Sequence, residues 1–157
     1  MKRQHIIIVV FGILFAISAQ ANVKEKALSR NQVPKAVIEA FEKAYPNAKE
    51  LDFEEEPFEG KTAYEVEYKT NGIGYEFLYS ADGVLLQKQE VIVDKALPPL
   101  VAQAIKKAHP NADIMEAEQV MNPDGAVTGY EVKVNVDGKV FELDLDVSGK
   151  TSKSEND

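Results

Sequence analysis

The sequence contains no cysteine and only two histidines, His5 and His109. Without cysteine the chain forms no disulfides, so its fold must rest on an apolar core. Common enzyme motifs are also missing, among them Gly-x-Ser-x-Gly, His-Glu-x-x-His, phosphate-binding loops and Cys-x-x-Cys. His109 directly precedes Pro110 at the end of an expected helix, where packing or capping explains it better than catalysis. We therefore expect neither enzymatic activity nor a cofactor.

Basic residues and long apolar runs are also scarce. The chain has 18 basic and 26 acidic residues with no basic patch in either half, which excludes nucleic acid as a natural partner. The apolar run at residues 6–19 is shorter than the roughly 20 residues that span a bilayer. Lys2 and Arg3 before it and small residues at 19–21 are typical of a secretory signal peptide. We expect cleavage after Ala21, a net charge of −10 instead of −8, no membrane insertion, and a periplasmic or secreted location.

The chain carries one pattern twice. Residues 33–48 return at 97–112, and Tyr64-Glu65-Val66 returns as Tyr130-Glu131-Val132. We divide the chain into a signal peptide (1–21), a short N-terminal segment (22–32), two repeats (33–96 and 97–151) and a disordered tail (152–157). The sequence leaves the oligomeric state open.

Each repeat begins with apolar residues at helical spacing and continues with residues that alternate between apolar and polar. Asn71-Gly72 and Asp137-Gly138 mark hairpin turns. The pattern predicts an α+β fold of two tandem repeats, each one helix followed by a three- to four-stranded antiparallel meander. We expect the two sheets to be joined, with both helices on one face. The acidic run at residues 54–56 is expected in a loop.

One helix covers one face of such a sheet, and the other face carries the alternating acids. Alternating charges of this kind are common on a sheet face that meets only solvent. The alternative interpretation is a surface that recognises a partner. An open face offers no apolar pocket to raise the pKa of a carboxyl group. The candidate residues for partner binding are Glu65, Glu67, Glu76, Glu131 and Glu142.

A metal site is a weaker interpretation of the second repeat. Asp144, Asp146, Gly149 and Glu155 have the spacing of acids and glycine in a calcium-binding loop of the EF-hand type. However, residues 141–147 alternate like a strand, and no helix is expected on either side. Asp144 and Asp146 remain the candidate metal ligands.

The patterns at Val33–Ala48, Tyr64-Glu65-Val66 and Asp82-Gly83-Val84-Leu85 resemble the PepSY-like domains, also described as β-lactamase-inhibitor-like. This resemblance implies an exported, non-enzymatic α+β domain similar in architecture to the β-lactamase inhibitor protein, whose joined sheets grip an enzyme with a concave face. The inhibitor's disulfides have no counterpart here, and its enzyme-contacting residues match no positions of this chain.

The sequence thus favours an exported binding module that recognises an envelope or secreted protein or peptide through an acidic open sheet face. Inhibition of the bound protein is one form that this recognition can take. The alternative is a periplasmic protein that binds or senses a divalent cation such as calcium.

Overall fold

The computed structural model describes residues 26–156, with side chains up to residue 151. The predicted signal peptide and its cleavage site lie outside the described residues. The two α-helices are α1 (Lys35–Ala44) and α2 (Pro99–Ala108), and the two short 3-10 helices are η1 (Arg30–Gln32) and η2 (Asp94–Ala96). The strands are β1 (Lys26–Ala27), β2 (Asp52–Phe58), β3 (Lys61–Thr70), β4 (Ile73–Ser80), β5 (Leu85–Ile92), β6 (Ala112–Met121), β7 (Val127–Val136), β8 (Lys139–Asp146) and β9 (Thr151–Asn156).

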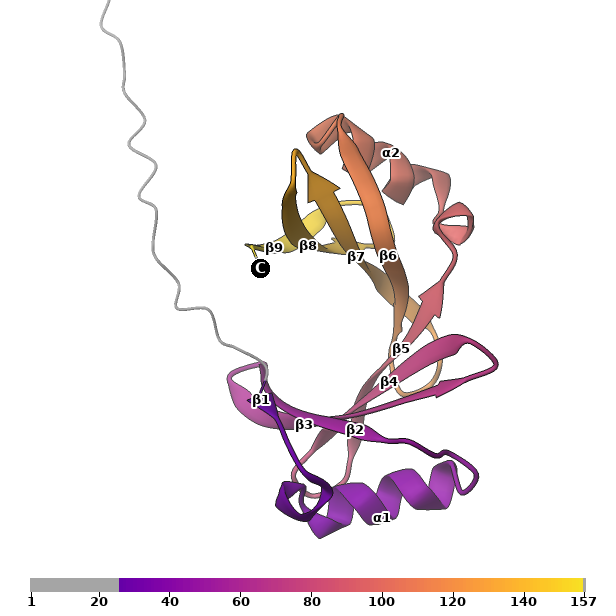
Figure 1. Ribbon diagram of the computed structural model, residues 1–157, viewed down its shortest axis with the longest axis vertical. Helices are drawn as coiled ribbons and strands as arrows, with labels where there is room; N and C mark the ends of the chain where they lie inside the picture. The colour runs from indigo at the N-terminus through magenta and orange to yellow at the C-terminus, as the bar shows by residue number, and fades with distance from the viewer. Residues whose placement is uncertain (1–25, 157) are drawn as a thin grey trace, which may run out of the picture.

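All nine strands form one antiparallel sheet in sequence order. The sheet curls into a half-open arc, and both α-helices lie on its outer side (Figure 1). Among the described residues, none of the helices has the length and apolar character needed to cross a membrane.

Each α-helix packs its apolar stripe on the part of the sheet made by its own repeat. Under α1 the core is aromatic: Phe41 is 1% exposed and meets Phe77 edge to face, with ring centroids 5.6 Å apart. Under α2 the core is aliphatic and contains Val101, Ile105 and Val132. The two helices were predicted correctly because their apolar positions recur with helical spacing.

The predicted arrangement of the sheet was wrong. The structure has one continuous curled sheet and two short α-helices, and it does not consist of two helix-plus-meander repeats that each contribute a sheet. The physical reason is β5, which pairs with β4 on one side and with β6 on the other. β5 follows β4 and is the last strand of the first copy. It also precedes α2 in the chain, as β1 precedes α1, so it serves as the first strand of the second copy.

Two further expectations are corrected by backbone pairing. Residues 54–56 lie inside β2 and pair with β3, whereas the sequence suggested a loop. Residues 151–156 form β9 on the edge of β8, whereas residues 152–157 were expected to be disordered. Strand pairing satisfies backbone hydrogen-bonding groups without requiring apolar side chains, so composition alone did not reveal either strand.

Candidate functional site

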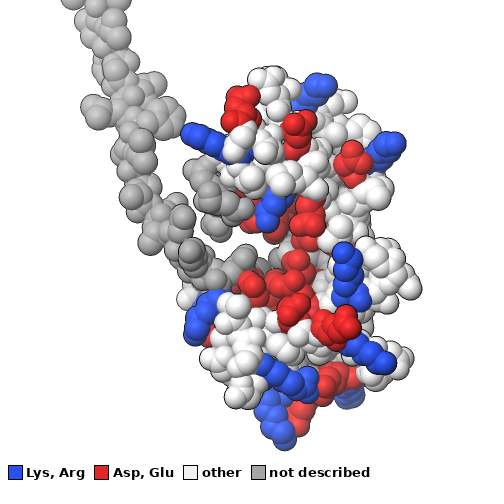
Figure 2. Space-filling view, viewed as in Figure 1, with Lys and Arg blue, Asp and Glu red and all other residues white. Residues whose placement is uncertain are grey.

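The inner face of the sheet, opposite the helices, is strongly acidic. Side chains alternate between the two faces of a strand, so residues next to core positions such as Val66, Val132 and Leu143 point inward. Figure 2 shows carboxylates gathered around a hollow between the two halves of the molecule. We define the acidic face as Glu54, Glu65, Glu67, Glu76, Glu118, Glu131, Glu142 and Asp144.

All five residues predicted for partner binding lie on the acidic face, spread over β3, β4, β7 and β8. The sequence analysis missed Glu54 and Glu118, which occupy equivalent places in the two copies. Glu54 lies directly opposite Glu65, and Glu118 lies directly opposite Glu131. Alignment of the two copies beyond the helices would have identified both positions, since Glu65 and Glu131 were already matched.

Acidic residues on the inner side of the sheet, Asp52 included, stand directly opposite one another across neighbouring strands. Such like-charge pairs destabilise a sheet, and solvated faces usually avoid them. Among the residues whose side chains are described, five pairs of this kind occur: Asp52 with Glu67, Glu54 with Glu65, Glu67 with Glu76, Glu118 with Glu131, and Glu131 with Asp144.

Glu118 lies in the middle of the sheet and is only 6% exposed. Its neighbour across β5 is the apolar Val91, and its neighbour across β7 is Glu131. Burial, followed by the negative charge of Glu76, raises the pKa of Glu118 from its ordinary 4.5 to about 8. The carboxyl group of Glu118 is therefore mostly protonated at neutral pH.

Glu131 behaves in the same way. Burial is the main cause, and the charges of Glu142 and Glu118 add to it, so the pKa of Glu131 rises to about 9. These two shifts correct the expectation that an open sheet face could not raise a carboxyl pKa. The inward curl of the sheet brings side chains together, and they shield one another from water.

Two glutamines of β5 form a hydrogen-bonded chain that reaches the acidic face at Glu76. Gln89 is 7% exposed, and its amide nitrogen donates a 2.8 Å hydrogen bond to Oε2 of Glu76. Gln87 in turn donates to Oε1 of Gln89 over 3.3 Å. This chain of hydrogen bonds fixes the orientation of Glu76 next to the junction of the two copies.

The two residues suggested as metal ligands take different places. Asp144 lies beside Glu131 and Glu142, and one carboxylate oxygen from each of these three residues falls within 4.8 Å of the other two. Asp146 instead accepts hydrogen bonds from the backbone and the hydroxyl group of Ser148 and from the backbone of Lys150, which lowers its pKa. Asp146 thus stabilises the turn between β8 and β9, and calcium binding stays a prediction.

The first copy supports this role of Asp146. At the equivalent turn of the first copy, serine and aspartate appear in reverse order. There the hydroxyl group of Ser80 donates a hydrogen bond to the carboxylate of Asp82. An acid paired with serine in both turns indicates a shared structural requirement.

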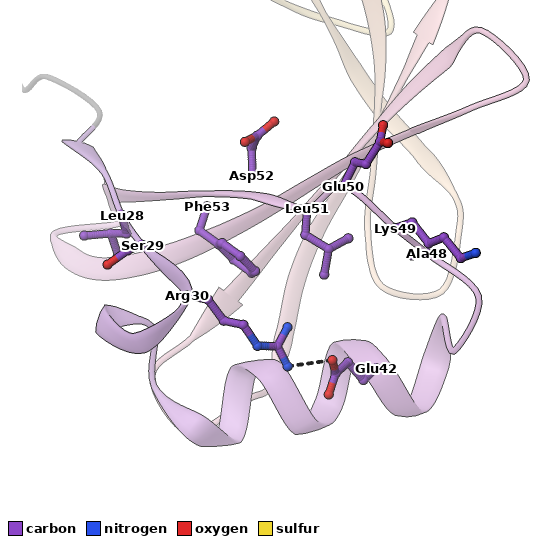
Figure 3. A pocket seen from close by; sticks show the side chains of 10 residues that line it. All are labelled: Leu28, Ser29, Arg30, Glu42, Ala48, Lys49, Glu50, Leu51, Asp52 and Phe53. Carbon is purple, nitrogen blue, oxygen red and sulfur yellow. Dashed lines mark hydrogen bonds and ion pairs between the residues drawn. The ribbon is translucent and has the colours of Figure 1, made fainter.

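A pocket lies on the opposite side of β2, next to α1. The ion pair between Arg30 and Glu42, 2.6 Å long, crosses it. Figure 3 shows Leu51 and Phe53 pointing toward α1, whereas Asp52 points away from it. The pocket is therefore separated from the acidic face by the strand itself.

A family model described as "Putative beta-lactamase-inhibitor-like, PepSY-like" matches the chain twice, over residues 18–87 and 84–153. The chain belongs to this PepSY-like family. The resemblance identified from the sequence is thereby confirmed. The two PepSY-like matches overlap at residues 84–87, where β5 begins, in agreement with a strand shared by both copies.

Solved structures share the fold of this PepSY-like protein at low sequence identity. A DUF2874 family protein from Bacteroides uniformis ATCC 8492 is 16% identical with a TM-score of 0.61, over 79% of this chain and 89% of that chain. One of the "putative periplasmic proteins" from Bacteroides eggerthii DSM 20697 is 16% identical with a TM-score of 0.62, over 79% and 88%. A BLIP-like protein from Bacteroides fragilis NCTC 9343 is 21% identical with a TM-score of 0.54, over 79% and 86%. No curated protein matches the chain.

Proposed function

We propose that this protein is an exported, non-enzymatic binding module whose acidic face holds a positively charged segment of a protein or peptide. The observation that carries the proposal is the set of directly opposed acidic pairs on the inner face. Pairs of ionised acids lower the stability of the free protein by repulsion, and at Glu118 and Glu131 burial of the carboxyl group adds its own cost. Natural sequences keep such local violations mainly where function requires them.

A cationic partner would relieve this repulsion. Basic side chains placed between the opposed carboxylates would turn like-charge contacts into attractive ones, and the partial shielding from water would strengthen them. An attractive contact of this kind favours the complex over the free protein.

The extent of the acidic face favours a chain segment as the partner. The face runs from β2 to β8, and neighbouring strands of a sheet lie about 4.8 Å apart, so it extends over roughly 25 to 30 Å along the curve of the sheet. An extended peptide of about eight or nine residues has this length. If such a segment bordered the active site of an enzyme, binding would inhibit that enzyme.

Two observations support an exported protein without catalytic activity. The N-terminal sequence has the layout of a signal peptide, and one structure of the same fold is described as one of the "putative periplasmic proteins". The acidic face offers carboxyl groups, but it contains no histidine, and the chain contains no cysteine. We propose binding without chemistry on this basis.

The proposal is tested by titrating the protein with an oligolysine peptide of about eight residues and with an oligoglutamate of equal length. We expect oligolysine to bind, the affinity to fall steeply as salt is added, and Glu65→Lys or Glu142→Lys to weaken binding at least tenfold. Glu39→Lys is the matched control, since Glu39 is exposed on α1 and its charge change is identical. Equal loss in Glu39→Lys and Glu142→Lys would show that net charge, and not the acidic face, governs binding.

A further inference from the structure

Apolar side chains border the acidic face near the end of β5. Val93 directly follows β5 and is 71% exposed, and Met115 on β6 is 57% exposed. The pairing of β5 with β6 ends just before Val93, and its continuation would place Val93 opposite Glu116, the neighbour of Met115. Single exposed apolar residues are common on protein surfaces, whereas apolar residues that lie together indicate an interaction site. We define the apolar strip as Val91, Val93 and Met115.

Val91 extends the strip along β5 toward the middle of the sheet. It is half-buried, lies directly opposite Glu118, and is separated from Val93 by Ile92, which packs in the core beneath α2. Because side chains alternate along a strand, Val91 is on the inner side of the sheet and Val93 follows in the same direction. The strip is therefore adjacent to the acids of β6 and separate from the core that the helices cover.

A β-bulge keeps Met115 out of the core. Ile114 and Glu116 both have partners on β7, and the register shifts between them, so Met115 is the extra residue of β6. Ile114 packs against the core beneath α2 in its place. In the first copy the equivalent of Met115 is Leu51, which packs in the core beneath α1 and points toward that helix (Figure 3). The second copy thus exposes an apolar side chain that the first copy buries.

Val93 also differs from its counterpart in the first copy. The equivalent residue is Ser29, which precedes η1 and whose hydroxyl group donates a hydrogen bond to Oε1 of Gln32. Val93 precedes η2 in the same way, but its side chain has no group that could form such a bond. The fold that the two copies share therefore requires an exposed apolar side chain at neither position, which indicates a role in recognition.

The acids next to the strip restrict what can cover it. Glu116 is exposed directly beside Met115, and the acidic face continues from Glu118. A second copy of this protein that placed strip against strip would bring these acids against their own counterparts, and such like charges repel. Charge complementarity favours an apolar side chain carried by a basic segment.

We propose that the apolar strip binds an aliphatic or aromatic side chain of the partner, next to the basic residues that the acidic face holds. The partner segment is then amphipathic, with an apolar anchor adjacent to lysine or arginine. This inference rests on the proposed function and narrows its partner from any basic segment to one of this kind. An apolar contact surrounded by charged groups is a common arrangement in protein interfaces.

The test uses nine-residue peptides of eight lysines and one leucine, with the leucine at the first, fifth or ninth position, and the same three peptides with alanine instead. In isothermal titration, leucine in at least one position should bind about tenfold more tightly than alanine, because most of its side chain leaves water. This ratio should persist when added salt weakens both peptides, since salt screens charges and not apolar contacts. The heat capacity change of binding should also be more negative with leucine.

Val93→Ser and Met115→Ser should each reduce the gain from leucine at least threefold and leave the affinity for the alanine peptides unchanged. Leu100→Ser is the matched control, because Leu100 is also an exposed apolar residue but lies on α2, on the outer side of the arc (Figure 1). This control should retain the full gain from leucine. The comparison of leucine with alanine in the unmodified protein decides even if a variant fails to fold.

Equal affinities of the leucine and alanine peptides would overturn the role of the strip and leave the proposed function intact. A gain from leucine that Val93→Ser and Met115→Ser retain, or that Leu100→Ser loses equally, would do the same. Absence of binding by every lysine peptide would overturn the proposed function itself. A dimer in analytical ultracentrifugation that Met115→Ser dissociates would make a second copy the occupant of the strip and overturn the inference.

Discussion

Replacement of Glu118 by glutamine should stabilise the protein at neutral and alkaline pH. In the folded protein Glu118 is buried and its pKa is raised to about 8, whereas in the unfolded chain it should titrate near its ordinary 4.5. Between these two values the unfolded chain loses its proton and the folded protein keeps it. Stability must therefore fall as the pH rises through this interval. Glutamine has nearly the same shape and cannot ionise, so this loss disappears in the variant.

The magnitude follows from the size of the shift. Each pH unit in the interval costs about 1.4 kcal/mol, so Glu118 should lower the free energy of unfolding by about 3 kcal/mol at pH 7 and by about 5 kcal/mol above pH 8. Below pH 4.5 the group is protonated in both states and contributes no difference. The advantage of Glu118→Gln over the unmodified protein should accordingly be absent at pH 4.5 and grow with pH up to about 8.

Urea denaturation followed by circular dichroism at intervals from pH 4.5 to 8.5 measures this effect. Glu116→Gln is the control, since it makes the same substitution at an exposed position two residues earlier on β6. The reasoning is refuted if Glu118→Gln gains no stability over Glu116→Gln between pH 6 and pH 8. A stability of the unmodified protein that does not fall above pH 5 would contradict it as well.

Three other predictions concern the fold. Gly83→Ala should destabilise the protein clearly more than Gly72→Ala in urea denaturation. Both glycines have a positive φ, so alanine is strained at either position. A Cβ at Gly83 would in addition lie 2.5 Å from the backbone oxygen of Ala36, whereas a Cβ at Gly72 meets nothing within 4 Å. Equal losses would show that φ alone requires the glycine. Phe41→Ala should cost about 3 to 5 kcal/mol in the same assay, because Phe41 is fully buried beneath α1, and a loss below 1 kcal/mol would show that this core is loosely packed. Tyr79 should ionise only near pH 12 in an ultraviolet titration, because burial raises its pKa to about 12, and ionisation near pH 10 would place it in water.

The elements that the sequence predicted well are those with one dominant period. The apolar stripe around Val37 and Phe41 recurs with helical spacing, and the alternation around Val66 and Val132 places Glu65 and Glu131 on the opposite face. These local patterns depend only on backbone geometry. They were sufficient to find the α-helices, the hairpins and five residues of the acidic face.

The features that were missed depend on contacts distant in sequence. β5 contains the polar run Gln87, Lys88, Gln89 and Glu90, so its composition does not indicate that it joins two copies in the middle of a sheet. The burial of Glu118 follows from the curl of that sheet, which no short window of sequence contains. The turn role of Asp146 became clear only from its hydrogen bonds to Ser148 and Lys150.

The central claim, that the acidic face is where a basic partner binds, is tested most directly by nuclear magnetic resonance. Backbone amide shifts of the isotope-labelled protein would be recorded as oligolysine is added. The account predicts that the largest changes occur on β3, β4, β6, β7 and β8, with Glu118 and Glu131 among them, and that α1 and α2 stay nearly unchanged. Changes concentrated on the helices or around the pocket of Arg30 and Glu42, or no saturable change, would contradict it.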